Sequence, residues 1–418
     1  MKSGDEFLCS IEKLVYGGKG LARIDGVVVF TPGVLKGEKV RVRVTRMRKN
    51  FAEAELFQIE EASPDRIDCN CLINCRPAPG CVYAHLTPEA ELAAKQEQYA
   101  DFLNRIFGDV DIFLPPENSP AVLHYRNKIT LHFSDGLLGY RQESSHLVVD
   151  TPKCPLANPE VNSLLSRFRS SKAFASLKNG DDVVFRSASG AGESVIRISR
   201  HGRKSFWNAD TDVFETKCEP LLRECALCGM LEVKASGFYQ VNREVSTAVA
   251  GHVADLYSDG RSKTPHVLDL FCGVGVFGIL CAQCGALTST GIESCGNAIE
   301  LARKNAAACG VAARFIRASL TGGGAIHQKW IRDATRTTVI MDPPRGGADS
   351  GCIESVVKHR FAKVIYVSCD PATLARDAKL LAKGGYRPAS AKLFNMFPRT
   401  ARFESVTEFL SEENFSGK

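Results

Sequence analysis

Two residues near the end of the chain have the types and surroundings of a nucleophile and a base. Cys369 follows the apolar stretch KVIYVS, which predicts a buried strand, and stands where that strand gives way to a loop. Open α/β sheets place their chemistry at such carboxyl ends. Glu404, in FPRTARFES, is the candidate proton acceptor. Most of the 16 cysteines are interpreted as small buried hydrophobic residues, but the neighbours of Cys369 make it the candidate nucleophile.

A third acidic residue, Asp342, stands in MDPPRGG directly after the apolar run TTVIM. Loops of this kind in nucleic-acid methyltransferases hold a flipped base beside the cofactor through the carboxylate and the backbone. The plainer alternative is an acid that caps a proline-rich turn. Methyltransferases that modify amino groups carry a similar loop but need no cysteine, whereas here Cys369 follows in the next predicted strand.

These groups suit methyl transfer to carbon 5 of uracil. That carbon is a poor nucleophile until a group adds across the 5,6 double bond. A thiolate that attacks C6 leaves an enolate with electron density at C5, which accepts the methyl group. A base then removes the C5 proton as the thiol leaves. The chemistry therefore needs a cysteine and a base.

A glycine-rich turn earlier in the chain indicates a nucleotide-type cofactor. The stretch VLDLFCGVGVFG places an apolar strand before Gly273, Gly275 and Gly278, and Glu293 ends the next strand. Glycine lets the backbone approach a nucleotide closely, and an acid at this place accepts hydrogen bonds from ribose hydroxyls. The spacing also fits NAD, and a turn that needs glycine for packing alone is a further alternative.

The elements around these residues predict an α/β protein of several domains. A chain of 418 residues is too long for one ordinary core. After Asn242, strands and helices alternate, which is typical of a doubly wound parallel sheet. Residues 88–200 indicate a central α/β region. Five short strands between Phe7 and Ile59 predict a small barrel.

The barrel carries a basic stretch. Residues 36–49 hold seven lysines and arginines against one acid, and VRVRV places Arg41 and Arg43 on one face of a strand. That face could follow the phosphates of a nucleic acid, or it could be the solvated outside of a barrel with valines in its core. The net charge of +6 permits a polyanionic partner without requiring one.

Composition places the chain among ordinary globular proteins. It is 44% hydrophobic and 24% charged. The first residues do not read as an export signal, and no apolar run is long enough to span a membrane. We therefore expect a cytoplasmic monomer with no membrane contact, in which the cysteines are reduced.

The motifs together resemble the RNA uracil-C5 methyltransferase family, most closely its 23S ribosomal RNA branch. They occur in the family's order: SPDR, YRNK, LGYR, GFYQVN, DLFCGVGVFG, GIE, DPPR, SCDPATLARD and FPRT followed by Glu404. The resemblance implies an N-terminal OB-like TRAM barrel that binds RNA (residues 1–62), a central α/β domain (63–235) and a Rossmann-like methyltransferase domain (236–418).

The resemblance also implies roles for single residues. Gln240, Phe271 and Glu293 would contact S-adenosylmethionine together with the turn at Gly273. Asp342 would lie between the cofactor and the uracil. Cys369 would attack C6, and Glu404 would take the C5 proton.

A cysteine-rich loop, CNCLINCRPAPGC, begins at Cys69. In the family, thiolates at such positions hold a [4Fe–4S] cluster, which requires four of them; here they would be Cys69, Cys75, Cys81 and Cys154. The family spacing is usually C-x5-C-x2-C, whereas RPAPG separates Cys75 from Cys81. Cys71 is a further candidate ligand, and zinc or no metal are the alternatives.

Other departures from the family pattern are Val276, Ser319, Asn395 and Arg402. The rival functions are an NAD-linked oxidoreductase, which leaves Cys369 and DPPR unexplained, and a catalytically silent RNA-binding protein. A transfer-RNA enzyme would, by resemblance, lack both the barrel and the cysteine loop. The favoured partner is therefore 23S ribosomal RNA.

Overall fold

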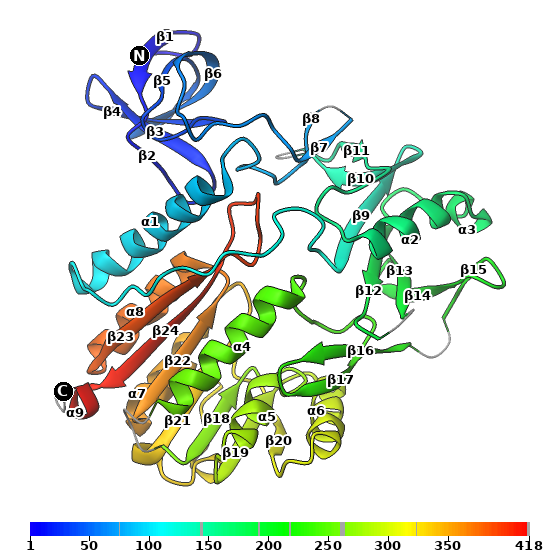
Figure 1. Cartoon of the computed structure of the whole chain (residues 1–418), viewed down its shortest axis with the longest axis vertical. Helices are drawn as coiled ribbons and strands as arrows, with labels where there is room; N and C mark the ends of the chain where they lie inside the picture. Colours follow the sequence, from blue (N-terminus) through cyan, green and yellow to red (C-terminus); the bar gives the residue numbers. More distant parts are fainter. Residues whose placement is uncertain are drawn as a thin grey trace.

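The computed structural model describes residues 1–74, 76–142, 145–190, 193–216, 219–259, 264–322 and 324–415. Figure 1 shows an N-terminal β-structure, a central sheet with its own helices, and a C-terminal α/β layer structure that carries the chain terminus. The mixed α/β class predicted from the sequence, with an N-terminal β-domain and a Rossmann-like C-terminal domain, is confirmed.

The N-terminal sheet has the order β1-β5-β6-β4-β3-β2. Its strands are β1 (Glu6–Ser10), β2 (Lys13–Leu14), β3 (Lys19–Ile24), β4 (Val27–Pro32), β5 (Lys39–Met47) and β6 (Phe51–Glu61). In β5 the valines Val40, Val42 and Val44 are buried, because alternate residues of a strand point to opposite faces. The valines form the core that the alternation predicted.

The cations on the other face of β5 are ion-paired in the structure. Arg43 lies 2.7 Å from Glu6, and Arg41 lies 3.2 Å from Glu60. Lys39 pairs with Glu61 at 3.1 Å. Acids from β1 and β6 therefore balance much of the basic charge that this strand presents to solvent.

The central region contains a seven-stranded antiparallel sheet with the order β11-β10-β9-β12-β13-β14-β15. Its strands are β9 (Lys128–Ser134), β10 (Leu137–Arg141), β11 (Val148–Asp150), β12 (Asp182–Ser187), β13 (Ser194–Arg200), β14 (Arg203–Asn208) and β15 (Val213–Glu215). Helices α2 (Pro159–Arg169) and α3 (Lys172–Ala175) pack on it. The short pair β7 (Leu72–Ile73) and β8 (Arg76–Pro77) precedes it, and the hairpin β16 (Leu221–Ala226) and β17 (Gly229–Lys234) leads onward.

The C-terminal sheet has the order β20-β19-β18-β21-β22-β24-β23, and its first five strands are parallel. The strands are β18 (His266–Leu270), β19 (Thr288–Glu293), β20 (Arg314–Arg317), β21 (Thr337–Met341), β22 (Lys363–Ser368), β23 (Tyr386–Phe394) and β24 (Glu404–Ser411). Every residue of β21 and β22 is buried, which is typical of a parallel sheet covered on both faces.

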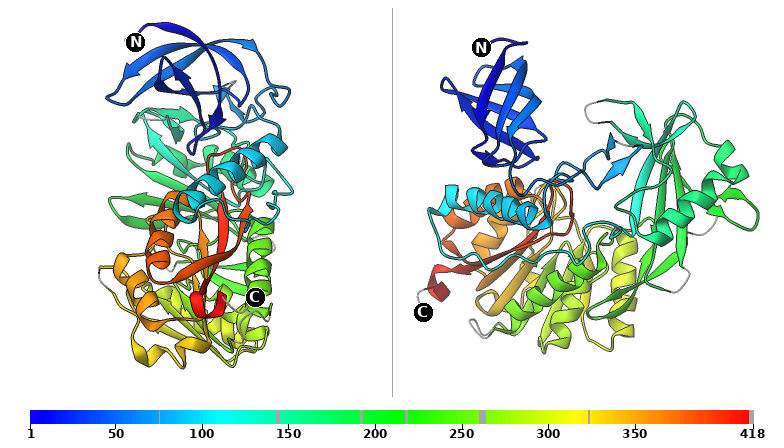
Figure 2. Two further views of the ribbon diagram at one scale, coloured as in Figure 1. Left: turned by 90° about the vertical axis from the view of Figure 1, so that its left-hand side faces the viewer. Right: turned by 45° about the horizontal axis from the view of Figure 1, so that its top comes forward.

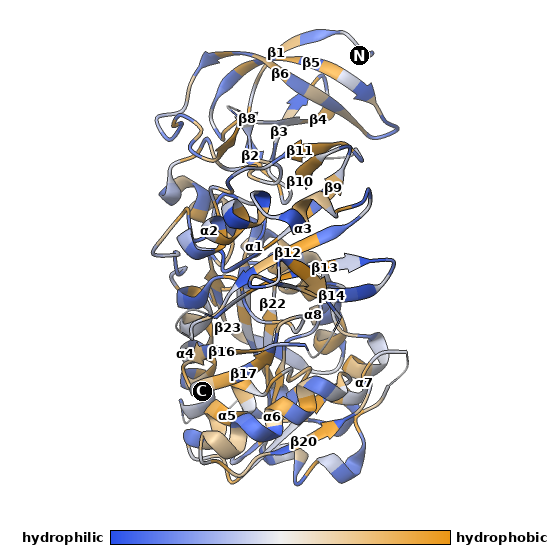
Figure 3. Cartoon of the chain, turned by 90° about the vertical axis from the view of Figure 1, so that its right-hand side faces the viewer, coloured by the Kyte–Doolittle hydropathy of each residue, from blue (hydrophilic) through white to orange (hydrophobic). Residues whose placement is uncertain are grey.

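Helices cover both faces of this sheet. They are α4 (Arg243–Ser258), α5 (Val276–Gln283), α6 (Gly296–Ala308), α7 (Ser350–His359) and α8 (Pro371–Lys383), with the short α9 (Glu412–Phe415) and the turns η1 (Gln328–Trp330) and η2 (Ala334–Arg336). Figure 3 shows both hydropathy colours on α6, as expected of a helix with one buried face. The doubly wound sheet predicted from the sequence is confirmed.

Helix α1 (Pro88–Phe107) lies between the N-terminal domain and the C-terminal sheet. It packs against α8 and β23, and its Phe107 contacts Phe409 of β24. The N-terminal domain lies beside the same helix (Figure 2), where Gln98 donates to the carbonyl of Leu14 at 3.3 Å. Lys36 pairs with Glu97 at 3.0 Å. The N-terminal domain is therefore packed against the helix that covers the C-terminal sheet.

Among the described residues, no helix has the length and apolar character needed to cross a membrane.

Candidate active site

Strand pairing brings Cys369 and Glu404 together. Strands β22 and β24 are antiparallel, and Ser368 pairs with Ser405. The Ser405 hydroxyl donates to the Ser368 carbonyl at 3.2 Å. Cys369 directly follows the first serine and Glu404 directly precedes the second, so both residues adjoin the last pair of the ladder, and the charge of Glu404 acts on the Cys369 thiol.

Asp342 reaches the same edge from the other side of β22. It follows β21, which is parallel to β22 with Met341 beside Tyr366. Its charge acts on both Cys369 and Glu404. The structure thus brings together the three residues that the sequence singled out as nucleophile, base and cofactor-side acid.

The surroundings of this site raise the pKa of all three groups. Glu404 is 2% exposed, and burial raises its pKa well above the usual value, with a further contribution from Asp342. Burial raises the pKa of Asp342 to about 7. Burial, with Glu404 and Asp342 nearby, raises the pKa of Cys369 to about 12, although Arg345 and Arg402 oppose this shift. A cation bound here would favour the charged forms.

The glycine turn forms a site that suits a cofactor. Gly275 has φ 93°, and a Cβ atom there would lie 2.9 Å from Phe315, so the turn needs glycine. Asp269, at 0% exposure, has one oxygen that accepts from the Gly278 amide at 2.9 Å. Its other oxygen is buried and has no hydrogen-bond partner among the described residues. Burial raises the pKa of Asp269 to about 8.

The other predicted cofactor residues surround this turn. Glu293 ends β19 and accepts from the amides of Gly273 at 3.3 Å and Cys295 at 2.7 Å. Phe271, half-buried, has φ 64°, which is unusual for a bulky residue. Gln240 is half-buried, and its neighbour Tyr239 packs in the same cluster as Cys272 and Val274. The carboxylate of Glu293 and the unpartnered oxygen of Asp269 fit a ligand with an amino group and ribose hydroxyls.

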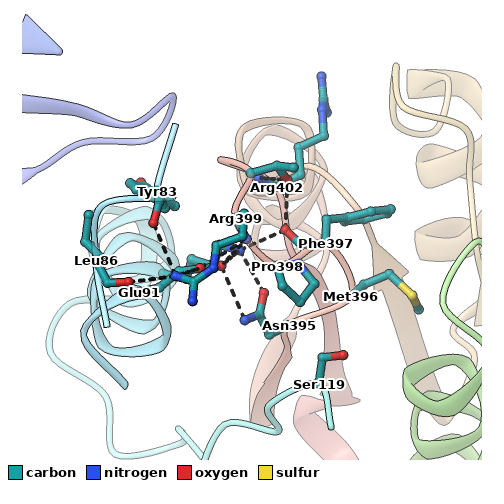
Figure 4. A network of polar contacts seen from close by, with 12 residues as sticks. Tyr83, Leu86, Glu91, Ser119, Asn395, Met396, Phe397, Pro398, Arg399 and Arg402 are labelled. Atoms are coloured by element: carbon teal, nitrogen blue, oxygen red, sulfur yellow. Dashed lines mark hydrogen bonds and ion pairs between the residues drawn. The ribbon is translucent and has the colours of Figure 1, made fainter. Parts of the chain in front are cut away.

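A buried charge cluster holds the loop that leads to Glu404 (Figure 4). Glu91 of α1 accepts from the Arg399 amide at 2.9 Å and from the Lys95 ammonium at 2.7 Å. All three side chains are at most 1% exposed. Arg399 has φ 69° and donates to the Leu86 carbonyl at 2.6 Å. Fully desolvated ionic groups tolerate little displacement, since an unpaired buried charge is costly.

Asn395 extends this cluster. It accepts from Lys95 at 2.7 Å and donates to Asn118 at 3.0 Å. The sequence identified Asn395 as a departure from the family pattern, and the structure gives it a full set of partners. The Tyr125 hydroxyl also donates to the Pro398 carbonyl at 3.1 Å. The sequence did not indicate the cluster, because glutamate and lysine one turn apart on a helix are typical of an exposed face.

The sequence also missed Tyr16. Its hydroxyl donates to Asp370 at 3.2 Å, although 354 positions separate the two residues. The only signal was an aromatic residue in the glycine-rich segment VYGGKG. Arg402 lies 3.7 Å from the same carboxylate.

The cysteine loop is only partly described. Cys75 lies outside the described residues. Cys71, Cys81 and Cys154 are buried, and Cys69 is half-buried. Interaction with the Cys81 thiol and burial raise the pKa of the Cys71 thiol, and the charges of Cys154 and Cys69 add to this shift. Among the described residues, no group of three or more histidine, cysteine or acidic side chains is arranged to hold a metal ion. These residues therefore do not support the predicted iron–sulfur site.

Two protein-family models match parts of this chain. Residues 230–412 match a family model described as tRNA (Uracil-5-)-methyltransferase, and residues 2–57 match the TRAM domain. A 23S rRNA (uracil(1939)-C(5))-methyltransferase RlmD of Acidithiobacillus ferrooxidans is 33% identical and is aligned over 96% of both chains. The RlmD of Pectobacterium atrosepticum is 29% identical over 94% of this chain and 91% of its own.

A solved structure has the same fold over the whole chain. It is the Pyrococcus abyssi tRNA (uracil-54, C5)-methyltransferase in complex with S-adenosyl-L-homocysteine, with a TM-score of 0.73 and 23% identity. The match covers 97% of this chain and 100% of that one. At this identity the likeness concerns the fold. Because the match spans the N-terminal domain of this chain, the expectation that a transfer-RNA enzyme lacks the barrel is wrong.

Burial and the nearby acids of Cys369 predict that its thiol reacts slowly with alkylating reagents. At pH 8 its alkylation by iodoacetamide should be slower than that of a free thiol and should still rise with pH, because only the thiolate reacts and its pKa is raised. Asp342→Asn removes a like charge and should speed alkylation. Peptide mass spectrometry of Cys369 measures both rates. An equal or slower rate in the variant would contradict this electrostatic account.

Loss of a charge from the buried cluster should destabilise the protein more than loss of an exposed charge. Glu91→Gln leaves Lys95 and Arg399 buried without their acid and should lower the free energy of unfolding by about 3 kcal/mol. The control Glu6→Gln removes the exposed partner of Arg43 and should cost under about 1 kcal/mol. Urea unfolding of both variants measures the difference. Similar small losses would show that the cluster does not hold the loop.

Proposed function

The chain belongs to the RNA uracil-C5 methyltransferase family, and on that premise we propose that Cys369 and Glu404 methylate uridine C5 in 23S ribosomal RNA through a covalent adduct. The family carries out S-adenosylmethionine-dependent methylation of RNA uracil at carbon 5. The observation that supports the proposed roles is the register of β22 and β24, which puts a thiol and a carboxyl group next to the last pair of the ladder, where the charge of Asp342 acts on both.

The proposed reaction proceeds by addition, methyl transfer and elimination. The Cys369 thiolate adds to C6 of the uracil, and electron density moves to C5 and O4. S-Adenosylmethionine, when bound, supplies an electrophilic methyl group. The Glu404 carboxylate then removes the proton from the methylated C5, the double bond re-forms, and Cys369 leaves as the thiolate. The net change replaces the C5 hydrogen by a methyl group, and one proton is released.

The charges of the site support this order of events. Without ligand, burial favours the protonated forms of Cys369, Asp342 and Glu404. The sulfonium of the methyl donor is a cation, which favours an ionised Asp342 and a thiolate. Arg345 and Arg402 act on Cys369 in the same direction. The raised pKa of Glu404 makes its carboxylate a stronger proton acceptor once it is ionised.

We assign the methyl donor to the glycine turn. The unpartnered oxygen of Asp269 and the side chain of Gln240 would hold the amino acid part. Glu293 would accept from the ribose hydroxyls, and Phe271 would contact the ring system beside Gly273. Asp342 would separate this site from the uracil.

Two relatives named as 23S ribosomal RNA enzymes align over more than nine-tenths of this chain, which supports ribosomal over transfer RNA as the substrate. The N-terminal domain matched by the TRAM model is the proposed RNA-binding part.

The central experiment compares RNA from cells with and without the gene, digested to nucleosides and analysed for 5-methyluridine. Loss of 5-methyluridine from 23S ribosomal RNA should be restored by the wild-type gene but not by Cys369→Ala, which lacks the nucleophile. Glu404→Gln should also fail, because its amide cannot take the C5 proton. Loss confined to transfer RNA would contradict the substrate, and full restoration by Cys369→Ala would contradict the mechanism.

We also propose that the cysteine loop holds a [4Fe–4S] cluster with Cys69, Cys75, Cys81 and Cys154 as its ligands, and with Cys71 as a candidate to replace Cys69 or Cys75. The support for this proposal is the number of cysteines in one loop together with Cys154, of which Cys71, Cys81 and Cys154 are buried. Sulfur ligands suit iron–sulfur clusters and zinc.

Protein purified without oxygen tests this proposal. It should contain about four irons and four sulfides per chain and absorb visible light. Cys81→Ser should lower the iron content, whereas Cys284→Ser, an exposed cysteine elsewhere, should not. Zinc without sulfide, or no metal, would contradict the cluster.

A further inference from the structure

Tyr16 of the N-terminal domain contacts the neighbours of both proposed catalytic residues. Its hydroxyl donates to Asp370 at 3.2 Å, directly after Cys369. Its ring lies edge-on to Phe403, directly before Glu404, with 6.1 Å between centroids and an interplanar angle of 79°. One side chain from β2–β3 thus bridges two segments that meet at the proposed reaction centre.

The turn that carries Tyr16 is held in place independently. Gly18 donates to the Val15 carbonyl at 3.0 Å, and both Gly17 and Gly18 have positive φ. A Cβ on Gly18 would lie 2.5 Å from a methyl group of Val82, so glycine allows the turn to pack against the chain beside the cysteine loop. Tyr16 also meets Phe102 of α1 edge-on at 6.0 Å. The tyrosine is therefore a fixed contact and not a mobile surface group.

Through Asp370, the residue after Cys369, Tyr16 supports the position of the proposed nucleophile. One oxygen of Asp370 caps α8 by accepting from the amides of Ala372 at 3.0 Å and Thr373 at 3.2 Å. The other oxygen is the one that Tyr16 donates to and that lies near Arg402. The cap sets how α8 begins directly after Cys369. Amides at the start of a helix stabilise a nearby thiolate.

Through Phe403, the residue before Glu404, Tyr16 also supports the position of the proposed base. Phe403 is fully buried, and it packs against Tyr99 as well as Tyr16. Removal of the Tyr16 ring would leave a void against the residue that leads into β24. A side chain beside such a void can shift, since tight packing otherwise fixes it.

We propose that Tyr16 is a positioning residue for methyl transfer, so that the N-terminal domain is a structural part of the catalytic centre as well as an RNA-binding module. Tyr16 orients Asp370 behind the nucleophile and Phe403 behind the base. This inference rests on the proposed roles of Cys369 and Glu404.

The test uses the full chain with Tyr16→Phe and Tyr16→Ala. Methyl transfer from labelled S-adenosylmethionine to a 23S ribosomal RNA fragment is measured in a single turnover with enzyme and cofactor saturating. RNA affinity and thermal unfolding are measured alongside. Tyr16→Ala should lower the saturated rate at least about tenfold, since small displacements at a reacting centre are costly, and change RNA affinity less than threefold. Tyr16→Phe keeps the ring against Phe403 but loses the hydrogen bond to Asp370, so its rate should lie between those of the wild type and Tyr16→Ala.

Phe30→Ala is the matched control. Phe30 lies in β4 and meets Phe51 edge-on within the N-terminal domain at 5.5 Å. Its loss should lower the stability of that domain and leave the saturated rate unchanged. An equal fall in rate for Phe30→Ala and Tyr16→Ala would reduce Tyr16 to a stabilising residue and overturn the proposal. So would weaker RNA binding with a wild-type saturated rate.

A second readout separates this inference from the proposed function. Alkylation of Cys369 needs no RNA, and Tyr16→Ala should change its rate several-fold because the contact that fixes the segment after the thiol is lost. If the wild type transfers no methyl group to any RNA but the alkylation rates differ, the proposed function fails and the positioning contact stands. If the wild type is active and both Tyr16 variants match it in both measurements, the positioning role is wrong.

Discussion

The site depends on one constraint, the insertion of β24 between β22 and β23. A purely parallel sheet would bring the carboxyl ends of its strands to one edge and could supply Cys369 and Asp342. It could not supply a base from the amino end of a strand. Because β24 runs antiparallel, its first residue, Glu404, meets the end of β22. The chemistry proposed here needs that reversal of direction.

The segment between β23 and β24 must therefore be held firmly, and the chain does this with charge buried outside the sheet. Glu91, Lys95 and Arg399 are desolvated together, and their partners include main-chain groups of the loop itself. Such a cluster adds little net stability compared with apolar packing, but it penalises displacement strongly. It also links α1, which the N-terminal domain packs against, to the residues just before Glu404.

The sequence predicted the secondary-structure elements, and the shared sheet edge of the proposed reacting residues, better than it predicted the contacts that support that edge. Cys369, Asp342 and Glu293 follow or end apolar strands, so their common edge could be inferred from strand order in a doubly wound sheet. The position of β24 depends on tertiary pairing and has no local signal. The buried charges of α1 follow a pattern that normally lies in solvent.

The ion pairs of the basic strand β5 also could not be predicted from the sequence. Residues 36–49 read as a cationic face, but the acids that pair with Lys39, Arg41 and Arg43 come from β1 and β6. Only the fold brings those acids into contact. Tyr16 is the clearest case, since its partner Asp370 lies at the other end of the sequence.

The central claim is that Cys369 forms a covalent bond to the uracil during methyl transfer. RNA that contains 5-fluorouridine tests it directly, because fluorine at C5 leaves no proton for a base to remove and the adduct cannot resolve. After reaction with S-adenosylmethionine and digestion, the account predicts a peptide in which Cys369 carries a methylated fluorouridine nucleotide. No adduct, or an adduct on another residue, from an enzyme that methylates ordinary RNA would contradict it.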